Sequence, residues 1–151
     1  MQLIPSGRVL GAKMEGLDLS RPLDDGEVDA IIEALGRHGV VCFPRQRLTA
    51  RQQKDFAARF GELEINVASG PYQEPGIPEV MTLSNIVKDG KPIGLPDAGQ
   101  DWHTDMSYIP DPPKASMLYA LEVPPAGGNT GFVNMYAVYE SLPSALQRRI
   151  E

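Results

Sequence analysis

Residues 101–108 read Asp101-Trp102-His103-Thr104-Asp105-Met106-Ser107-Tyr108, and this stretch carries the sharpest chemical signal in the sequence. On an extended segment, successive side chains point to opposite faces. His103 and Asp105 are therefore expected on one side and Thr104 on the other. A histidine and a carboxylate on one side can share a metal ion. They supply two of the three protein ligands in the two-histidine, one-carboxylate site of non-haem Fe(II) oxygenases.

A His-x-Asp tripeptide also occurs in solvated loops, so the flanking residues decide between the two interpretations. Downstream, the apolar run 116–123 predicts a strand, 124–129 a turn and 130–133 a further strand. Residues 135–142 and 143–150 are expected to be helical, with Pro143 at a helix start.

The residues upstream of the tripeptide predict two helices that pack on a sheet. Asp24 or Asp25 can cap a helix that ends at His38-Gly39, and its apolar positions follow helical spacing. Thr49 and Gln52 form a capping box that opens the second helix. Short strands are expected within residues 8–19, 40–43 and 80–86. The apolar positions expected on the buried face of the first helix are Val28, Ile31, Ile32 and Leu35.

Composition restricts the partners of this 151-residue chain. Its 14 basic and 20 acidic residues give a net charge of −6, which argues against nucleic-acid and anionic-membrane partners, because both require a basic patch. No apolar run approaches the length that crosses a bilayer. A single cysteine, Cys42, cannot form an intrachain disulfide and is expected to be a small buried hydrophobe. We therefore expect a cytoplasmic protein without membrane or nucleic-acid partners.

Beyond the tripeptide, the chain resembles the taurine dioxygenase and 2,4-dichlorophenoxyacetate dioxygenase family, whose members are Fe(II)- and 2-oxoglutarate-dependent. The resemblance runs from about Leu10 to Pro143 in one continuous order, which is more specific than any single motif. The matching segments are 11–12 (GA), 16–19 (GLDL), 38–41 (HGVV), 59–63 (RFGEL), 102–108 (WHTDMSY), 112–113 (PP), 116–120 (SMLYA), 123–130 (VPPAGGNT) and 135–143 (MYAVYESLP).

The resemblance implies a mainly β fold with flanking helices, the double-stranded β-helix or jelly roll, and makes residues 1–151 the N-terminal portion of one such domain. It implies that His103 and Asp105 are catalytic iron ligands and that Thr130 binds the carboxylate of 2-oxoglutarate. With O2, the cosubstrate would yield succinate and CO2 while a small organic acid or sulfonate is hydroxylated. A homo-oligomer is also compatible with the family.

Two polar residues are weaker substrate candidates. Asn66 stands where taurine-type members carry a substrate-contacting histidine, a departure that argues against taurine itself. Asn85 follows a predicted strand and has a turn-capping role as its alternative. The aromatic residues around the tripeptide are expected in the core, namely Trp102, Tyr108 and Tyr119.

The resemblance also indicates which parts of the family's iron and 2-oxoglutarate site are missing from residues 1–151. The family's third iron ligand is a distant downstream histidine, followed by an arginine that pairs with 2-oxoglutarate. The only other histidine here, His38, ends a predicted helix and is not expected to bind iron, and Arg148 and Arg149 come too early. We therefore expect an incomplete jelly roll, part of a longer enzyme. The alternative is a truncated, non-catalytic homologue that acts as a binding or oligomerisation module.

Overall fold

The computed structural model describes residues 1–151, except for the side chains of residues 67–69. The residues group into two compact units. The first comprises Met1–Asp18, Leu23–Gln46 and Ala120–Glu151, and the second comprises Leu19–Pro22 and Arg47–Tyr119. Each unit is described by itself.

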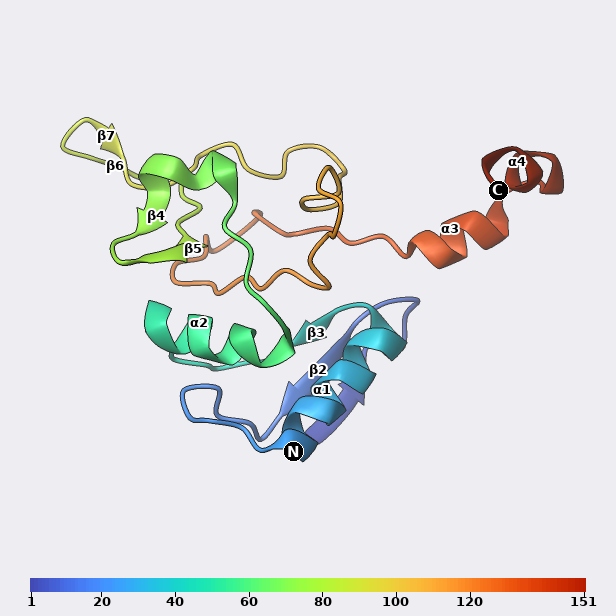
Figure 1. Ribbon diagram of the computed structural model, residues 1–151, viewed down its shortest axis with the longest axis horizontal. Coiled ribbons are helices and arrows are strands. Elements are labelled where there is room, and N and C mark those ends of the chain that lie inside the picture. The colour runs from blue at the N-terminus through green and yellow to red at the C-terminus, as the bar shows by residue number, and fades with distance from the viewer. The chain divides into compact units, whose positions relative to one another are not determined.

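A three-stranded sheet forms the centre of the first unit. Strand β2 (Ala12–Glu15) pairs antiparallel with β1 (Gln2–Pro5) and parallel with β3 (Val41–Cys42), in the order β1-β2-β3 (Figure 1). The predicted strand within residues 8–19 is thus confirmed in part, and its antiparallel partner lies at the N-terminus. Along β2, Ala12 and Met14 are buried, as expected for a strand with one face on the core.

Helix α1 (Asp25–His38) covers this sheet and begins and ends at the predicted residues (Figure 1). The Asp24 side chain accepts a hydrogen bond from the Glu27 backbone, and the Glu27 side chain accepts one from the Asp24 backbone, which completes a capping box. At the other end, Gly39 adopts φ 70° and donates its N–H to Leu35 O at 2.7 Å. A left-handed residue of this kind favours glycine.

The buried face of α1 confirms Val28 and Ile31, but Ala34 is buried in place of Ile32, and Leu35 is only half-buried. Val28, Ile31 and Ala34 are buried, whereas Ile32 is 50 % exposed. A helix turns by about 100° per residue, so only one of two adjacent isoleucines can face the sheet fully. Ile31, at 1 % exposure, occupies that place.

The two C-terminal helices also belong to the first unit. Helix α3 (Met135–Ser141) is capped by Asn134, whose side chain accepts a hydrogen bond from the Ala137 backbone at 3.1 Å. Helix α4 (Ser144–Ile150) follows Pro143, which stands at its N-cap. Both predicted helices are confirmed to within one residue at each end.

The second unit contains α2 (Ala50–Ala57), η1 (Ala58–Phe60) and η2 (Val67–Tyr72), with four short strands. Thr49 and Gln52 form the predicted capping box. The Phe56 and Phe60 rings pack edge to face, with centroids 5.1 Å apart. The strands form two antiparallel pairs, β4 (Gln73–Glu74) with β5 (Ile77–Met81) and β6 (Val87–Lys88) with β7 (Lys91–Pro92).

Helix α2 packs against β5, and an ion pair joins the two elements. Lys54 Nζ lies 2.5 Å from Glu79 Oε1, and both side chains are largely buried. This hydrogen bond from Lys54 holds the pKa of Glu79 below its ordinary value of 4.5.

The structure shows small sheets and helices, and the residues described form no closed barrel. The strands predicted at 116–123 and 130–133 are wrong, because among the residues described both segments are irregular and neither pairs in a hydrogen-bonded β-ladder. Apolar side chains of this region are consequently exposed, among them Leu118, Leu121, Val123 and Phe132.

Three expected core residues are also exposed. Trp102 is 75 % exposed, Tyr108 is 67 % exposed, and Cys42 is exposed at the end of β3. The segments that carry the two aromatic residues are irregular, so no second layer packs over them in the part of the chain described. Tyr119 is half-buried, and its hydroxyl accepts a hydrogen bond from the Leu48 N–H at 3.0 Å. Every helix whose residues are described is too short or too polar to cross a bilayer.

Candidate functional site

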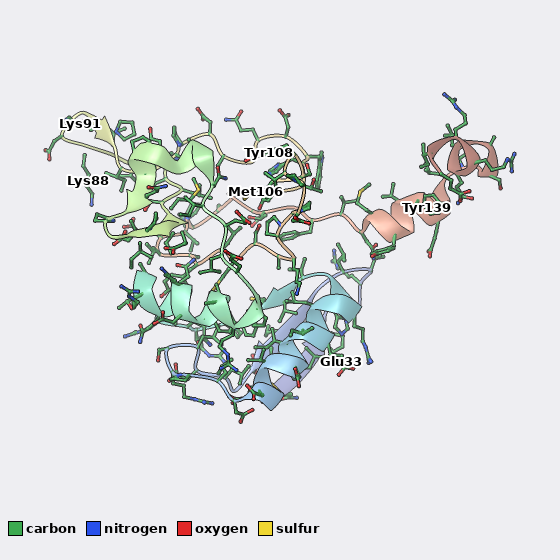
Figure 2. The ribbon with its side chains drawn as sticks, viewed as in Figure 1. Glu33, Lys88, Lys91, Met106, Tyr108 and Tyr139 are labelled. Carbon is green, nitrogen blue, oxygen red and sulfur yellow. The ribbon has the colours of Figure 1, made fainter. Side chains whose placement is uncertain are left out.

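The candidate site lies on an irregular segment of the second unit, where the chain reverses direction after Asp105. Residues 105–108 form a turn, and the Ile109 N–H donates to Met106 O at 3.2 Å. Met106 adopts φ 50°, a left-handed conformation that is uncommon for a residue with a side chain. Figure 2 shows the side chains of Met106 and Tyr108 on this turn. The turn ends the segment that bears His103 and Asp105.

The backbone of Asp101 orients the His103 ring. His103 Nδ1 lies 2.7 Å from the Asp101 carbonyl oxygen. A carbonyl only accepts hydrogen bonds, so Nδ1 carries the proton that it donates. In the neutral ring, Nε2 then presents a lone pair, which is the form of histidine that binds a metal.

The Nε2 atom of His103 faces the Asp105 carboxylate. His103 Nε2 and Asp105 Oδ1 are 3.1 Å apart, so the two side chains converge as the alternation of an extended segment predicts. The pKa of His103 is raised, first by the hydrogen bond to the Asp101 carbonyl and further by the Asp105 carboxylate, while desolvation opposes both. Both contacts therefore favour the protonated, positively charged form of the His103 ring.

A cation fits this pair of atoms. A carboxylate oxygen and the Nε2 of a neutral imidazole are both acceptors, so they approach each other only with a proton or a metal ion between them. Two ligand atoms at about 2.1 Å from one metal and at right angles to each other would be about 3.0 Å apart. The observed 3.1 Å matches that separation. Among the described side chains, however, no group of three histidine, cysteine, aspartate or glutamate residues could hold a metal ion.

Ser116 completes the arrangement, although no motif or spacing in the sequence singles it out. Its Oγ donates to Asp105 Oδ2 at 2.6 Å, across a separation of 11 residues. The two carboxylate oxygens of Asp105 thus have different partners. A serine in an apolar stretch after two prolines is not distinctive, so only the folded chain identifies this contact.

The other predicted site residues lie on three separate segments of the chain. Thr130 belongs to the first unit, where it is exposed and lies two residues after Gly128, which like Gly127 has positive φ. Asn66 is half-buried just before η2. Asn85 is exposed on the connection between β5 and β6, and the neighbouring Ser84 Oγ accepts the Ile86 N–H there at 3.1 Å.

Known proteins resemble the chain over nearly its whole length. The family model described as "Taurine catabolism dioxygenase TauD, TfdA family" matches residues 2–151. Pentalenolactone F synthase of Streptomyces avermitilis is 37 % identical, over 95 % of this chain and 48 % of the relative. The alpha-ketoglutarate-dependent 2,4-dichlorophenoxyacetate dioxygenase of Cupriavidus pinatubonensis is 35 % identical, over 97 % of this chain and 54 % of the relative.

A solved structure shows the same similarity in three dimensions. The crystal structure of a taurine dioxygenase from Burkholderia xenovorans superimposes with a TM-score of 0.81 at 35 % identity, over 99 % of this chain and 50 % of that one. The chain spans about half the length of the curated relatives it matches.

Proposed function

Because the chain belongs to the taurine catabolism dioxygenase TauD, TfdA family, we propose that its polypeptide is an Fe(II)- and 2-oxoglutarate-dependent dioxygenase that hydroxylates a small organic acid or sulfonate. One observation carries the proposal. His103 Nε2 and Asp105 Oδ1 face each other at 3.1 Å, while Nδ1 is engaged by the Asp101 carbonyl. These are two ligand atoms of the type and spacing that one metal cation needs.

In the proposed reaction, each residue has a defined task. The Asp101 carbonyl fixes the His103 tautomer, and the Asp105 carboxylate supplies negative charge that offsets the metal's charge. An iron(II) ion bound there would bring 2-oxoglutarate and O2 together, so that C–H, 2-oxoglutarate and O2 become C–OH, succinate and CO2. Thr130 is proposed to bind the carboxylate of 2-oxoglutarate, and Asn66 and Asn85 are weaker candidates for substrate contact.

The fold proposed for the whole polypeptide is the jelly roll, with residues 1–151 as the N-terminal portion of one domain. The exposed apolar side chains of residues 116–133 support it, since such a segment is stabilised when further strands pair with it and cover it. The third iron ligand and an arginine for 2-oxoglutarate would come from outside these 151 residues. A cytoplasmic location and a homo-oligomeric state stay predictions.

The proposed class of substrate follows the names of the relatives. One acts on 2,4-dichlorophenoxyacetate, an organic acid, and a structural neighbour is a taurine dioxygenase, named for a sulfonate. Both molecules carry an acidic group on a small carbon skeleton. Identity of 35 % over this chain supports the reaction type more strongly than the individual substrate.

The test is succinate formation from 2-oxoglutarate by the full polypeptide that the gene encodes, with Fe(II), O2 and a panel of aryloxy acids and alkyl sulfonates. We expect substrate-dependent succinate release that is lost in His103→Gln. The chain's other histidine provides the matched control, because His38 ends α1 and His38→Gln should keep the activity. Absence of succinate with every substrate would favour the non-catalytic alternative. Activity of His103→Gln equal to that of the parent would refute the role of His103 as an iron ligand.

A further inference from the structure

Ser116 gives the two oxygens of the Asp105 carboxylate different roles. Asp105 Oδ2 accepts the Ser116 hydroxyl at 2.6 Å, while Oδ1 lies 3.1 Å from His103 Nε2. A hydroxyl-to-carboxylate bond of 2.5–2.7 Å belongs to the short, charge-assisted class and is roughly twice as strong as a neutral bond. The carboxylate is therefore held on the side away from the histidine.

This contact bears on how a cation would be bound. A free carboxylate can offer either one oxygen or both oxygens to a metal ion. A carboxylate that binds through both oxygens occupies an additional coordination position, which a chelating cosubstrate and O2 would need. A proton donated to Oδ2 lowers the electron density of that oxygen and opposes rotation about the Cβ–Cγ bond.

We propose that Ser116 is a positioning residue for the metal site, because its hydroxyl holds the Asp105 carboxylate so that Oδ1 alone faces the cation beside His103. The inference rests on the proposed function, since it assumes that His103 and Asp105 bind a metal ion. It assigns to Ser116 a task that neither the motif nor its spacing indicates. In this proposal Ser116 acts through the Asp105 carboxylate.

The exposure of Ser116 separates this role from a purely structural one. The residue is exposed, and its hydroxyl donates a hydrogen bond to Asp105. Removing one hydroxyl from an exposed serine usually changes stability little. Loss of an outer-shell partner of a metal ligand, in contrast, typically weakens metal binding by about 10–100-fold.

The experiment measures the Kd of Mn(II), as a stand-in for Fe(II), by the electron paramagnetic resonance signal of the free ion. It compares the full polypeptide with Ser116→Ala, Ser116→Thr and Ser141→Ala. Ser141 is the matched control, since it is an exposed serine whose Oγ donates a hydrogen bond of 2.7 Å, to Val138 O in α3. Thermal unfolding of the metal-free proteins is recorded in parallel.

We expect Ser116→Ala to weaken Mn(II) binding by about tenfold or more. Ser116→Thr keeps the hydroxyl and should stay within about threefold of the parent, and Ser141→Ala should leave the Kd unchanged. The metal-free proteins should unfold at the same temperature.

The proposal is overturned if Ser116→Ala binds Mn(II) within about twofold of the parent, if Ser116→Thr is no better than Ser116→Ala, or if Ser141→Ala causes the same loss. A parent that binds Mn(II) and loses it on His103→Gln, but not on Ser116→Ala, refutes only the role of Ser116. A parent that binds no Mn(II) refutes the proposed metal site together with this inference.

Discussion

Two adjacent isoleucines on α1 provide a direct test of how the first unit is packed. Ile31 is 1 % exposed and Ile32 is 50 % exposed, so replacing each with alanine removes the same atoms from two different environments. The change in helix propensity is the same at both positions and cancels in the comparison. What is left is the difference in burial.

The expected magnitudes follow from that difference. Truncating a fully buried isoleucine to alanine costs about 2–5 kcal/mol, because the lost transfer free energy is increased by the cavity that is left behind. A half-exposed isoleucine forfeits only about half of a burial term of roughly 1.5–3 kcal/mol, and it leaves no enclosed cavity. We therefore expect Ile31→Ala to lower the free energy of unfolding by about 2 kcal/mol more than Ile32→Ala.

Urea unfolding of the two variants and the parent measures this difference. The slope of unfolding free energy with urea should be the same in all three proteins, so that the midpoints report stability alone. Equal losses, within about 0.5 kcal/mol, or a larger loss at Ile32, would refute the orientation of α1 on the sheet.

Three further changes test local features of the fold. Thr49→Ala removes the cap of α2 and should cost about 1 kcal/mol in urea unfolding, and a loss below about 0.3 kcal/mol would contradict the capping box. Gly39→Ala should destabilise the protein by more than about 1 kcal/mol, because φ is +70° and the added Cβ would lie 2.7 Å from a leucine methyl carbon. Its control is Gly36→Ala, which adds a Cβ inside α1 with no neighbouring atom within 4 Å and should stabilise the protein by about 0.5–1 kcal/mol. Stability changes of the same sign for both glycine variants would contradict the described end of the helix. Glu79→Gln should lower the melting temperature at about pH 7 and have less effect near pH 3. The lowered pKa of Glu79 means that its ionised form stabilises the fold above pH 4.5, and this contribution is lost as the pH falls through the pKa of the folded protein. A difference in melting temperature between variant and parent that grows in acid would refute the ion pair.

Local signals allowed the helices to be predicted well. The caps of α1 and α2 depend on residues three apart in the chain, Asp24 with Glu27 and Thr49 with Gln52, and such contacts are visible in the sequence. Pro143 marks the start of α4 in the same way. The hydrophobic period placed Ile31 on the buried face, but it could not separate Ile31 from Ile32, because the exact orientation of a helix is set by the sheet beneath it.

The irregular structure of residues 116–123 and 130–133, where strands were predicted, could not be foreseen in the same way. An apolar run such as 116–123 has the propensity for a strand, but a strand also needs a partner for its backbone N–H and C=O groups. Among the described residues this segment pairs in no β-ladder, and its Leu118 and Leu121 are exposed. The burial predicted for Trp102 is also wrong, because the segment that carries it is irregular and the side chain is exposed.

The candidate site was predictable where it is local and unpredictable where it is not. The convergence of His103 and Asp105 follows from their separation of two residues. Ser116 reaches Asp105 only because the turn after Asp105 returns the chain, and no spacing rule specifies that contact. The roles of Thr130, Asn66 and Asn85 stay predictions.

The central claim is that His103 and Asp105 are two ligands of an iron site that also binds 2-oxoglutarate. The most direct measurement mixes the full polypeptide with Fe(II) and 2-oxoglutarate in the absence of oxygen and records the visible charge-transfer band of the iron chelate. We predict a band at near-stoichiometric iron that is lost in Asp105→Asn and in His103→Gln, while both variants stay folded. A band of equal intensity in the parent and in both variants would place the iron elsewhere and contradict the account.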